Sequence, residues 1–449
     1  MPNGAPGRLA VVALPVVLVA CGSSRGAGAP SPADASTDGP PVDSSLPDAQ
    51  PGDGPSGAPQ DGGTDAPGDA SADAPGEAAV VPLPALPLHT TSRWIVDANG
   101  KRFKLASVSW YGAEEKDFVV AGLDFQDVHA IAKTIRALGF NSVRLPFSNQ
   151  LVETNPLVAS ARLAANPSLQ GRTALEVMDA VIEALAEQGL VVILDDHTSN
   201  ADWCCSTTDG NGLWYTPGYP ESAWLADWKT MATRYLAQPA VVAADLRNEL
   251  RASDAGTPTW DGTGSALDWH GAAERGGNAV LGVNPALLVI VEGLSYSNDL
   301  TGVYSLPVQL PVDGRLVYSP HDYEFDHPAG ISAANLATDL GNEWGYILAQ
   351  GKTYTAPVWV GEFGTCNTAA SCVSGTSDQG GWFAGFGAYL QNADIDWSYW
   401  AINGTEASGT GRTLGAPETY GVLDTAWDAG ASDALTEALQ ALEPATQGP

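Results

Sequence analysis

The chain has 449 residues, with 52 acidic against 20 basic side chains and a formal net charge of −32 at pH 7. Binding to nucleic acid requires clustered Lys and Arg, so this excess of acids argues against a nucleic-acid partner. It is compatible with a neutral polymer such as a glycan, although charge by itself speaks to solubility rather than to function.

The N-terminus has the pattern of an export signal. An apolar run of twelve residues, Leu9 to Ala20, follows Arg8. The run is too short to span a bilayer, which needs about 20 residues. It ends in Leu18-Val19-Ala20-Cys21, which resembles a bacterial lipobox, where the cysteine is acylated. We therefore expect residues 1–21 to be a lipoprotein signal peptide, Cys21 to be lipidated, and the protein to be a cell-surface or outer-membrane lipoprotein of a bacterium. A plain secretory signal with a chance cysteine is the alternative.

Residues 22–86 consist mostly of Ala, Gly, Pro, Ser, Thr and Asp and include no aromatic residue. Such a segment cannot bury enough apolar surface to offset the entropy of ordering it, so we predict a disordered linker. Residues 87–449 hold all fourteen Trp residues and are long enough for one large domain.

The first element of that domain is a predicted β-hairpin over Trp94–Phe103 with an Asn-Gly turn. Short apolar runs then alternate with amphipathic segments. Predicted strands are Leu105–Trp110, Ser142–Pro146, Val191–Asp195, Val242–Leu246, Leu287–Val291, Leu316–Ser319, Val358–Gly361 and Asp396–Trp400. Predicted helices lie near 126–138, 173–188, 222–237, 266–281, 332–349, 378–392 and 432–442. The connection between the fifth and sixth of these strands has the weakest helical signal.

Strands that alternate with helices indicate a parallel sheet. Runs such as Leu190–Leu194 and Leu287–Val291 are apolar throughout, which indicates burial on both faces. Eight such units predict an α/β fold, the (β/α)8 TIM barrel. A doubly wound open sheet is the alternative, but it would carry a Gly-rich phosphate loop after the first strand, and Ser109-Trp110-Tyr111-Gly112 is not one.

In a TIM barrel, function lies at the C-terminal ends of the strands. Six of the predicted strands end in charged or aromatic side chains: Arg144, Asp195 to His197, Asp245 with Asn248 and Glu249, His321 to Tyr323, Glu362, and Trp400. Each side chain by itself has an ordinary explanation as an ion-pair partner or a core residue. Together at one rim, convergent carboxylates indicate catalysis.

Two carboxylates that flank a bond suit glycoside hydrolysis. The main rival is a cation held by His321, Asp322, Asp326 and His327, but the chain has no HxH or HExxH pattern, and we predict no metal and no cofactor. A serine hydrolase needs Gly-x-Ser-x-Gly at a strand-to-helix turn, and the match at residues 22–26 lies in the predicted linker.

Four cysteines follow the predicted signal: Cys204, Cys205, Cys366 and Cys372. An oxidising compartment would permit two disulfides, and their three possible pairings stay open. A zinc site is disfavoured, because the adjacent Cys204 and Cys205 lack the gap that tetrahedral cysteine sites favour.

Asn248-Glu249 after the fourth strand and Gly361-Glu362-Phe363-Gly364 at the seventh resemble the signatures of glycoside hydrolase family 5, which includes many cellulases. The similarity covers about Trp94 to Leu442. It implies a retaining mechanism in which Glu249 is the acid/base and Glu362 the nucleophile. The substrate-binding residues that it implies are Arg144, His197, Asn248, His321, Tyr323 and Trp400.

Many family members have Pro after the acid/base glutamate, whereas this chain has Leu250. The runs Asp245–Arg251 and Asp202–Ser206 are more similar to a plant-like branch of the family. The resemblance implies a cellulase-like endo-β-1,4-glucanase that acts as a monomer. Mannan, xyloglucan and β-1,3- or β-1,6-glucan remain alternative substrates, and a non-catalytic glycan-binding lipoprotein is the alternative of another class. Trp203, Trp214 and Trp260 are candidate stacking platforms for sugars, with loop packing as their alternative role.

Overall fold

The computed structural model describes residues 82–375 and 377–449. The predicted signal peptide with Cys21, and the predicted linker as far as residue 81, lie outside the described residues. Within the described part, eight parallel strands form one sheet in the order β8-β7-β6-β5-β4-β3-β10-β9. The strands are β3 (Ala106–Ser109), β4 (Ser142–Ser148), β5 (Val191–Thr198), β6 (Val241–Asp245), β7 (Leu288–Glu292), β8 (Leu316–Ser319), β9 (Trp359–Phe363) and β10 (Asp396–Tyr399).

The two edge strands of this sheet meet and close it into a barrel. Parallel bridges join Tyr318 to Val358 and His321 to Glu362. The main-chain N–H of Asp322 donates to the Glu362 carbonyl at 3.1 Å. The predicted (β/α)8 barrel is therefore confirmed, with all eight strands where the sequence predicts them.

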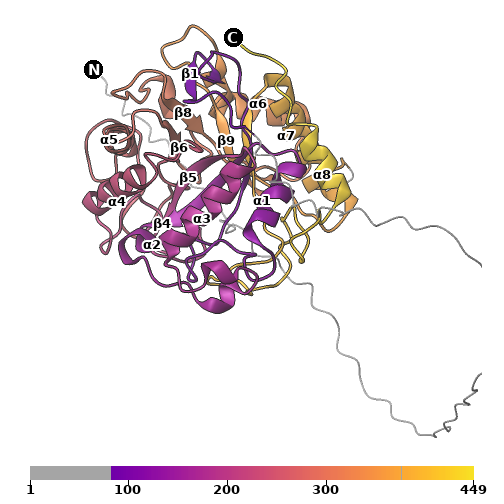
Figure 1. Cartoon of the computed structure of the whole chain (residues 1–449). Coiled ribbons are helices and arrows are strands. Elements are labelled where there is room, and N and C mark those ends of the chain that lie inside the picture. The colour runs from indigo at the N-terminus through magenta and orange to yellow at the C-terminus, as the bar shows by residue number, and fades with distance from the viewer. Residues whose placement is uncertain (1–81, 376) are drawn as a thin grey trace, which may run out of the picture. The chain divides into compact units, whose positions relative to one another are not determined.

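Helices cover the outside of the barrel (Figure 1). They are α1 (Val128–Ala137), α2 (Asn149–Thr154), α3 (Ala174–Glu187), α4 (Glu221–Arg234), α5 (Trp269–Leu281), α6 (Ala333–Glu343), α7 (Asp378–Ala393) and α8 (Asp433–Gln440). Residues 293–315, all described, contain only the 3-10 turn Thr301–Tyr304, which agrees with the weak helical signal there. The short α2 is absent from the sequence prediction. No helix of the described residues is long and apolar enough to cross a membrane.

The inner face of the barrel changes from apolar to charged along the strands. On β7, Leu288 and Ile290 belong to an inner apolar cluster, and Glu292 follows two residues later on the same face. On β5, Val191 and Ile193 occupy the same cluster and Asp195 follows. The period of two in a strand thus places carboxylates above an apolar floor, at the end of the barrel where the strands terminate.

A hairpin with apolar side chains contacts that floor. β1 (His89–Thr91) pairs antiparallel with β2 (Trp94–Val96), and Leu88 and Ile95 are buried in the inner cluster. The predicted hairpin over Trp94–Phe103 is only partly right. Its turn forms, with Gly100 N donating to the Asp97 carbonyl at 2.9 Å, but the return segment pairs with β2 as a single bridge, and the full antiparallel partner is β1.

The folded unit also begins before Pro87, the boundary that the sequence analysis assigns. Leu83 and Leu86 pack against the inner cluster. The main-chain N–H of Ala98 donates to the Ala85 carbonyl at 2.8 Å. The last residues of the predicted linker therefore belong to the folded unit.

Candidate active site

Arg144, fully buried on β4, is the charged centre of the rim. Its guanidinium donates to Asp245 Oδ2 at 3.0 Å, to Glu362 Oε1 at 2.5 Å and to Asn248 Oδ1 at 2.8 Å. It also lies 3.1 Å from Glu292 Oε1 and 3.2 Å from Asp195 Oδ2. A planar cation with a fixed fork of donors can hold several carboxylates in one geometry, which suits a preorganised site.

Glu362 on β9 has both carboxylate oxygens in contact with donors. Oε1 accepts from Arg144, and Oε2 accepts from the Tyr323 hydroxyl at 3.0 Å. Burial raises the pKa of the Glu362 carboxyl, and the charges of His321 and Arg144 counteract this rise. Donors on both oxygens favour the ionised form, so the hydrogen bonding suits a carboxylate nucleophile.

Glu249, four residues beyond Asp245 at the end of β6, is held through its backbone. Its φ is 44°, in the left-handed region, and its N–H donates to Glu292 Oε2 at 2.7 Å. The side chain lies 3.1 Å from His321 Nδ1 through Oε1, whereas Oε2 is buried with no hydrogen-bond partner among the described residues. A free carboxyl oxygen next to an occupied one suits a group that carries a proton to a ligand.

The two glutamates lie close together. One carboxylate oxygen of Glu249, one of Glu362 and a ring nitrogen of His321 all lie within 4.8 Å of one another. Retaining glycosidases place their two carboxyl groups about 5–5.5 Å apart, whereas inverting enzymes need about 6.5–9.5 Å for an intervening water. The short separation fits the retaining geometry.

His321, at the end of β8, lies between three carboxylates. Its Nδ1 faces Glu249, and its Nε2 lies 3.3 Å from Glu292 Oε1. Burial by itself would lower the pKa of His321, but the charges of Glu292 and Glu362 and the hydrogen bonds to Glu249 and Glu292 raise it well above its ordinary value. Burial likewise works against ionisation of Glu292, yet His321 and Arg144 lower the pKa of Glu292 to about 2. An imidazolium therefore pairs with a carboxylate beneath the two glutamates.

Aromatic rings form the wall on the side of β10. Trp400 stacks on Tyr111 with ring centres 5.2 Å apart, and on His197 with centres 5.3 Å apart. Trp203 contacts Tyr111 edge to face at 5.5 Å and is partly exposed. The His197 ring is held by Asp195, whose Oδ2 lies 2.7 Å from Nδ1. Flat rings at a polar rim suit stacking on the apolar face of a sugar.

Trp214 does not reach this wall, which corrects its assignment as a platform. It is fully buried, and its indole N–H donates to Glu221 Oε2 at 2.9 Å. Its ring packs against Trp269 in the core. Because Trp214 has no exposed face, it has none to offer a sugar. Trp260 is partly exposed and packs against the core, and its indole N–H donates to the Leu306 carbonyl at 2.8 Å, which fits the alternative role in loop packing.

The cysteine pairing is also settled by the structure. Disulfides join Cys204 to Cys205 and Cys366 to Cys372. Cys204 and Cys205 lie beside His197 in a cluster that could otherwise bind a metal, but disulfide sulfurs are not thiolate ligands. A second such cluster, Asp195, Asp245 and Glu292, surrounds the Arg144 guanidinium, which already neutralises it.

Two residues of the rim, Glu292 and Tyr111, are not among those predicted from the sequence. Glu292 ends β7 directly after the apolar run that ends at Val291, so the rule applied to the other strands would have found it. Tyr111 follows β3 and stacks on Trp400, and its position just after a strand carried the same signal. The other predicted residues that the structure brings to this rim are Arg144, His197, Asn248, Glu249, His321, Tyr323, Glu362, Trp400 and, at its edge, Trp203.

Two proteins are similar in sequence to most of this chain. An endoglucanase from Paenibacillus polymyxa is 37% identical over 335 residues, which cover 70% of this chain and 79% of the relative. A glycosyl hydrolase 5 family protein from the plant Chamaecyparis obtusa is 34% identical over 378 residues, covering 77% of this chain and 64% of the relative.

Solved structures share the fold. The catalytic domain of the major endoglucanase from Xanthomonas campestris pv. campestris is 30% identical, with a TM-score of 0.66, and the match covers 79% of this chain and 99% of that domain. An endocellulase from Pyrococcus horikoshii, solved in complex with cellotetraose, is 25% identical with a TM-score of 0.67, covering 80% of this chain and 99% of that one. The family model Cellulase (glycosyl hydrolase family 5) matches residues 96–406. The chain therefore belongs to glycosyl hydrolase family 5 and is a glycoside hydrolase.

Proposed function

We propose that the chain is a retaining endo-β-1,4-glucanase in which Glu362 is the nucleophile and Glu249 the acid/base. The observation that carries the proposal is the pair of buried carboxylates, with oxygens within 4.8 Å, in unlike surroundings. Glu362 receives donors on both oxygens, whereas Glu249 keeps Oε2 without a partner among the described residues. Environments that differ in this way let one carboxyl act ionised while the other carries a proton.

The mechanism follows from these contacts. Ionised Glu362 attacks the anomeric carbon while Glu249 gives its proton to the departing glycosidic oxygen, leaving a glycosyl ester on Glu362. Glu249, now ionised, takes a proton from water, which attacks the same carbon and releases Glu362. The imidazolium of His321, 3.1 Å from Glu249, stabilises the carboxylate that forms in the first step.

The substrate assignment rests on the relatives. Those from Paenibacillus and Xanthomonas bear the name endoglucanase, and the Pyrococcus structure holds cellotetraose. The stacked wall of Trp400 and the adjacent Trp203 supply apolar surface for a sugar ring. Reducing-sugar release from a panel of cellulose, mixed-linkage glucan, mannan, xyloglucan and β-1,3-glucan tests the choice, and a preference for any of the last three would overturn it.

The protein's location is part of the same proposal. The lipobox pattern that ends at Cys21 supports a lipid-anchored cell-surface or outer-membrane enzyme. The composition of residues 22–81 supports a disordered tether between that anchor and the barrel. We propose that the enzyme acts as a monomer and that its partner is the polysaccharide substrate. The non-catalytic alternative is disfavoured, because such a protein would not need both glutamates with their contacts to Arg144 and His321.

Replacement of each glutamate by Ala tests the roles. Glu362→Ala should stop turnover, because no glycosyl-enzyme can form. Glu249→Ala should lower kcat on polysaccharide on the order of 10²- to 10⁴-fold, the usual contribution of general acid catalysis. An aryl glycoside needs little protonation, so with Glu249→Ala its glycosyl-enzyme should accumulate and be visible by mass spectrometry.

Azide distinguishes the two roles by the anomer formed. With Glu249→Ala, azide should attack the glycosyl-enzyme and give a β-glycosyl azide. With Glu362→Ala, azide should occupy the vacated face and give an α-glycosyl azide. The exposed Glu437→Ala on α8 is the matched control and should keep full activity. The opposite pair of anomers would show that the two roles are exchanged.

A further inference from the structure

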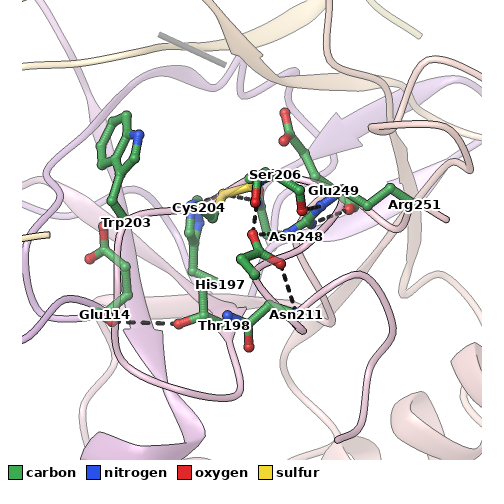
Figure 2. The surroundings of a disulfide bond; sticks show 12 residues. Glu114, His197, Thr198, Trp203, Cys204, Ser206, Asn211, Asn248, Glu249 and Arg251 are labelled. Carbon is green, nitrogen blue, oxygen red and sulfur yellow. Dashed lines mark hydrogen bonds and ion pairs between the residues drawn. A yellow bond between two sulfur atoms is a disulfide. The ribbon is translucent and has the colours of Figure 1, made fainter. Parts of the chain in front are cut away.

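The disulfide between the adjacent residues Cys204 and Cys205 lies within the active site (Figure 2). It belongs to the loop after β5, and its two residues are only 8% and 2% exposed. On one side it meets His197 of β5, and on the other it meets Asn248, the neighbour of Glu249. The disulfide therefore contacts two polar side chains of the rim, His197 and Asn248.

The contacts to Asn248 fix the orientation of its amide. Both sulfurs lie 3.5 Å from Asn248 Nδ2, while Oδ1 accepts from Arg144 at 2.8 Å. Divalent sulfur is a weak acceptor, so the two contacts contribute mainly by filling space on the amide's nitrogen side. The second proton on Nδ2 is then the one available to a ligand hydroxyl.

The contacts to His197 fix its ring in the same way. Nδ1 is 2.7 Å from Asp195, the ring stacks on Trp400, and Nε2 lies 3.5 Å from Cys204 Sγ. Burial by itself would lower the pKa of His197, but the charge of Asp195 and the hydrogen bond to it raise the pKa. Nε2 therefore faces the disulfide at Cys204 Sγ, and the ring cannot turn without losing its contact to Asp195.

The same loop is tied to the backbone of the acid/base. Arg251 donates through Nη1 to the Glu249 carbonyl at 2.8 Å and through Nε to the Ser206 carbonyl at 3.1 Å. It also donates to Asp209 Oδ2 at 2.5 Å. A shift of the disulfide loop would therefore displace Asn248, His197 and the main chain of Glu249 together.

We propose that the Cys204–Cys205 disulfide is a positioning group, which holds Asn248 and His197 toward the sugar ring that Glu362 attacks. The inference rests on the proposed function, and it takes Asn248, which the resemblance to family 5 gives as a substrate-binding residue, to donate to the 2-hydroxyl of that sugar. Such a bond strengthens in the transition state, so correct placement of Asn248 acts on kcat more than on KM.

The chain offers a matched control in its second disulfide. Cys366–Cys372 also closes a loop after a barrel strand, but Cys372 contacts the hydroxyls of Thr365 and Thr368 rather than Asn248 or His197. The two variants to compare are Cys204→Ala/Cys205→Ala and Cys366→Ala/Cys372→Ala. Each removes one disulfide of the described residues and leaves the other.

The measurement is kcat and KM for an aryl β-cellobioside and for its analogue that lacks the 2-hydroxyl on the ring beside the aryl group. The ratio of the two kcat/KM values reports the bond made by Asn248. Loss of Cys204–Cys205 should lower this ratio by about tenfold, with most of the effect on kcat, and should add nothing in an Asn248→Ala background. Loss of Cys366–Cys372 should leave the ratio unchanged.

A second readout does not need turnover. In the Cys366→Ala/Cys372→Ala protein, a phosphine reductant should open Cys204–Cys205 and shift the NMR titration of His197, while exposed His129 stays unchanged. If the ratio of the two kcat/KM values and the His197 titration both stay unaltered, the proposal is overturned. A fall in melting temperature would not rescue it, because the disulfide would then only stabilise the loop. A wild-type protein inactive on both substrates would instead refute the proposed function, and the His197 titration would still decide the positioning role.

Discussion

Glu292 contacts three different groups of the active site. Its Oε1 lies 3.1 Å from Arg144 and 3.3 Å from His321 Nε2, while Oε2 accepts from the Glu249 N–H at 2.7 Å. The carboxylate therefore holds the cation beneath the glutamates and also the left-handed backbone of the acid/base. Side chains that lock the rotamers of catalytic groups decide how well a site is preorganised.

Replacement of Glu292 by Gln should change the pH dependence as well as the rate. The charge of Glu292 helps raise the pKa of His321, so Glu292→Gln should let His321 lose its proton at a lower pH. The high-pH limb of the kcat/KM profile should move toward acid, and kcat should fall by about tenfold or more. Profiles of wild type, Glu292→Gln and the exposed Glu437→Gln check this. A high-pH limb that stays in place would show that another group sets it.

The rim residues differ in how far the sequence could predict them. Arg144, Glu249 and Glu362 stand out because a charge at the end of an apolar strand is expensive to bury without a function or a partner. Glu292 carried the same signal. The buried position of Trp214 could not be predicted in this way, because a loop sequence does not show whether a large ring faces the cleft or the core. Tertiary packing decides that orientation.

At the scale of elements, the loop after β5 carries two Trp residues with opposite environments. Trp203 is partly exposed beside Trp400, and Trp214 is fully buried against Trp269. Trp203→Ala should raise KM for long oligosaccharides by roughly three- to tenfold with little loss of stability. Trp214→Ala should cost about 3–5 kcal/mol of stability through the cavity it leaves. Kinetics and thermal melting of both variants check the pair, and the reverse pattern would contradict the assignment.

Two helices dock on β5 through a buried polar link. Asn149 of α2 donates from Nδ2 to Asp196 Oδ2 on β5 at 3.2 Å and to Asp227 Oδ2 on α4 at 3.0 Å. Burial, with the neighbouring negative charges, raises the pKa of Asp227 to about 8. Burial also raises the pKa of Asp196 to about 7, although Arg247 opposes the rise. The folded protein thus keeps protons here that the unfolded chain releases near pH 4.

The sign of this linkage gives a stability prediction. Both folded pKa values are raised, so their contribution is fully present below about pH 4 and is lost as the pH rises through 7 to 8. Asp227→Asn does not titrate and can still accept from Asn149. Relative to wild type, its melting temperature should therefore be higher at pH 8 than at pH 5 by roughly 2 °C. Melting of both proteins at the two pH values measures this, with the exposed Asp428→Asn as control. An equal difference at both pH values would exclude the linkage.

The elements themselves were predictable where hydrophobic periodicity is strong. Fully apolar strand runs and amphipathic helices of ten or more residues carry their period in the sequence, and these elements match the structure. The six-residue α2 is too short to show a period, and the three-residue strands β1 and β2 are defined by each other and by the inner cluster. Their pairing is a tertiary effect, which a single segment does not encode.

At the scale of the whole molecule, the barrel has a closed apolar end and a charged open end. Leu88 and Ile95 of the β1–β2 region cover the inner cluster, and Arg144 with its carboxylates lies at the other end of the strands. Leu83 to Leu88, among the first described residues, thus lie next to the apolar floor, whereas the catalytic glutamates lie at the C-terminal ends of the strands.

This arrangement makes anchoring and catalysis separable. Acylation of Cys21 supplies the hydrophobic anchor in the proposed lipoprotein, so Cys21→Ser should move the enzyme from the membrane fraction to the soluble fraction. Because Cys21 lies outside residues 87–449, which carry all the site residues, kcat and KM on soluble oligosaccharides should stay within about twofold of wild type. Fractionation with immunoblotting, and kinetics on the released protein, test both statements.

Ser23→Ala, two residues beyond the cysteine, is the matched control and should leave the protein with the membranes. A Cys21→Ser protein that still sediments with membranes would show that the lipobox reading is wrong, whatever its activity.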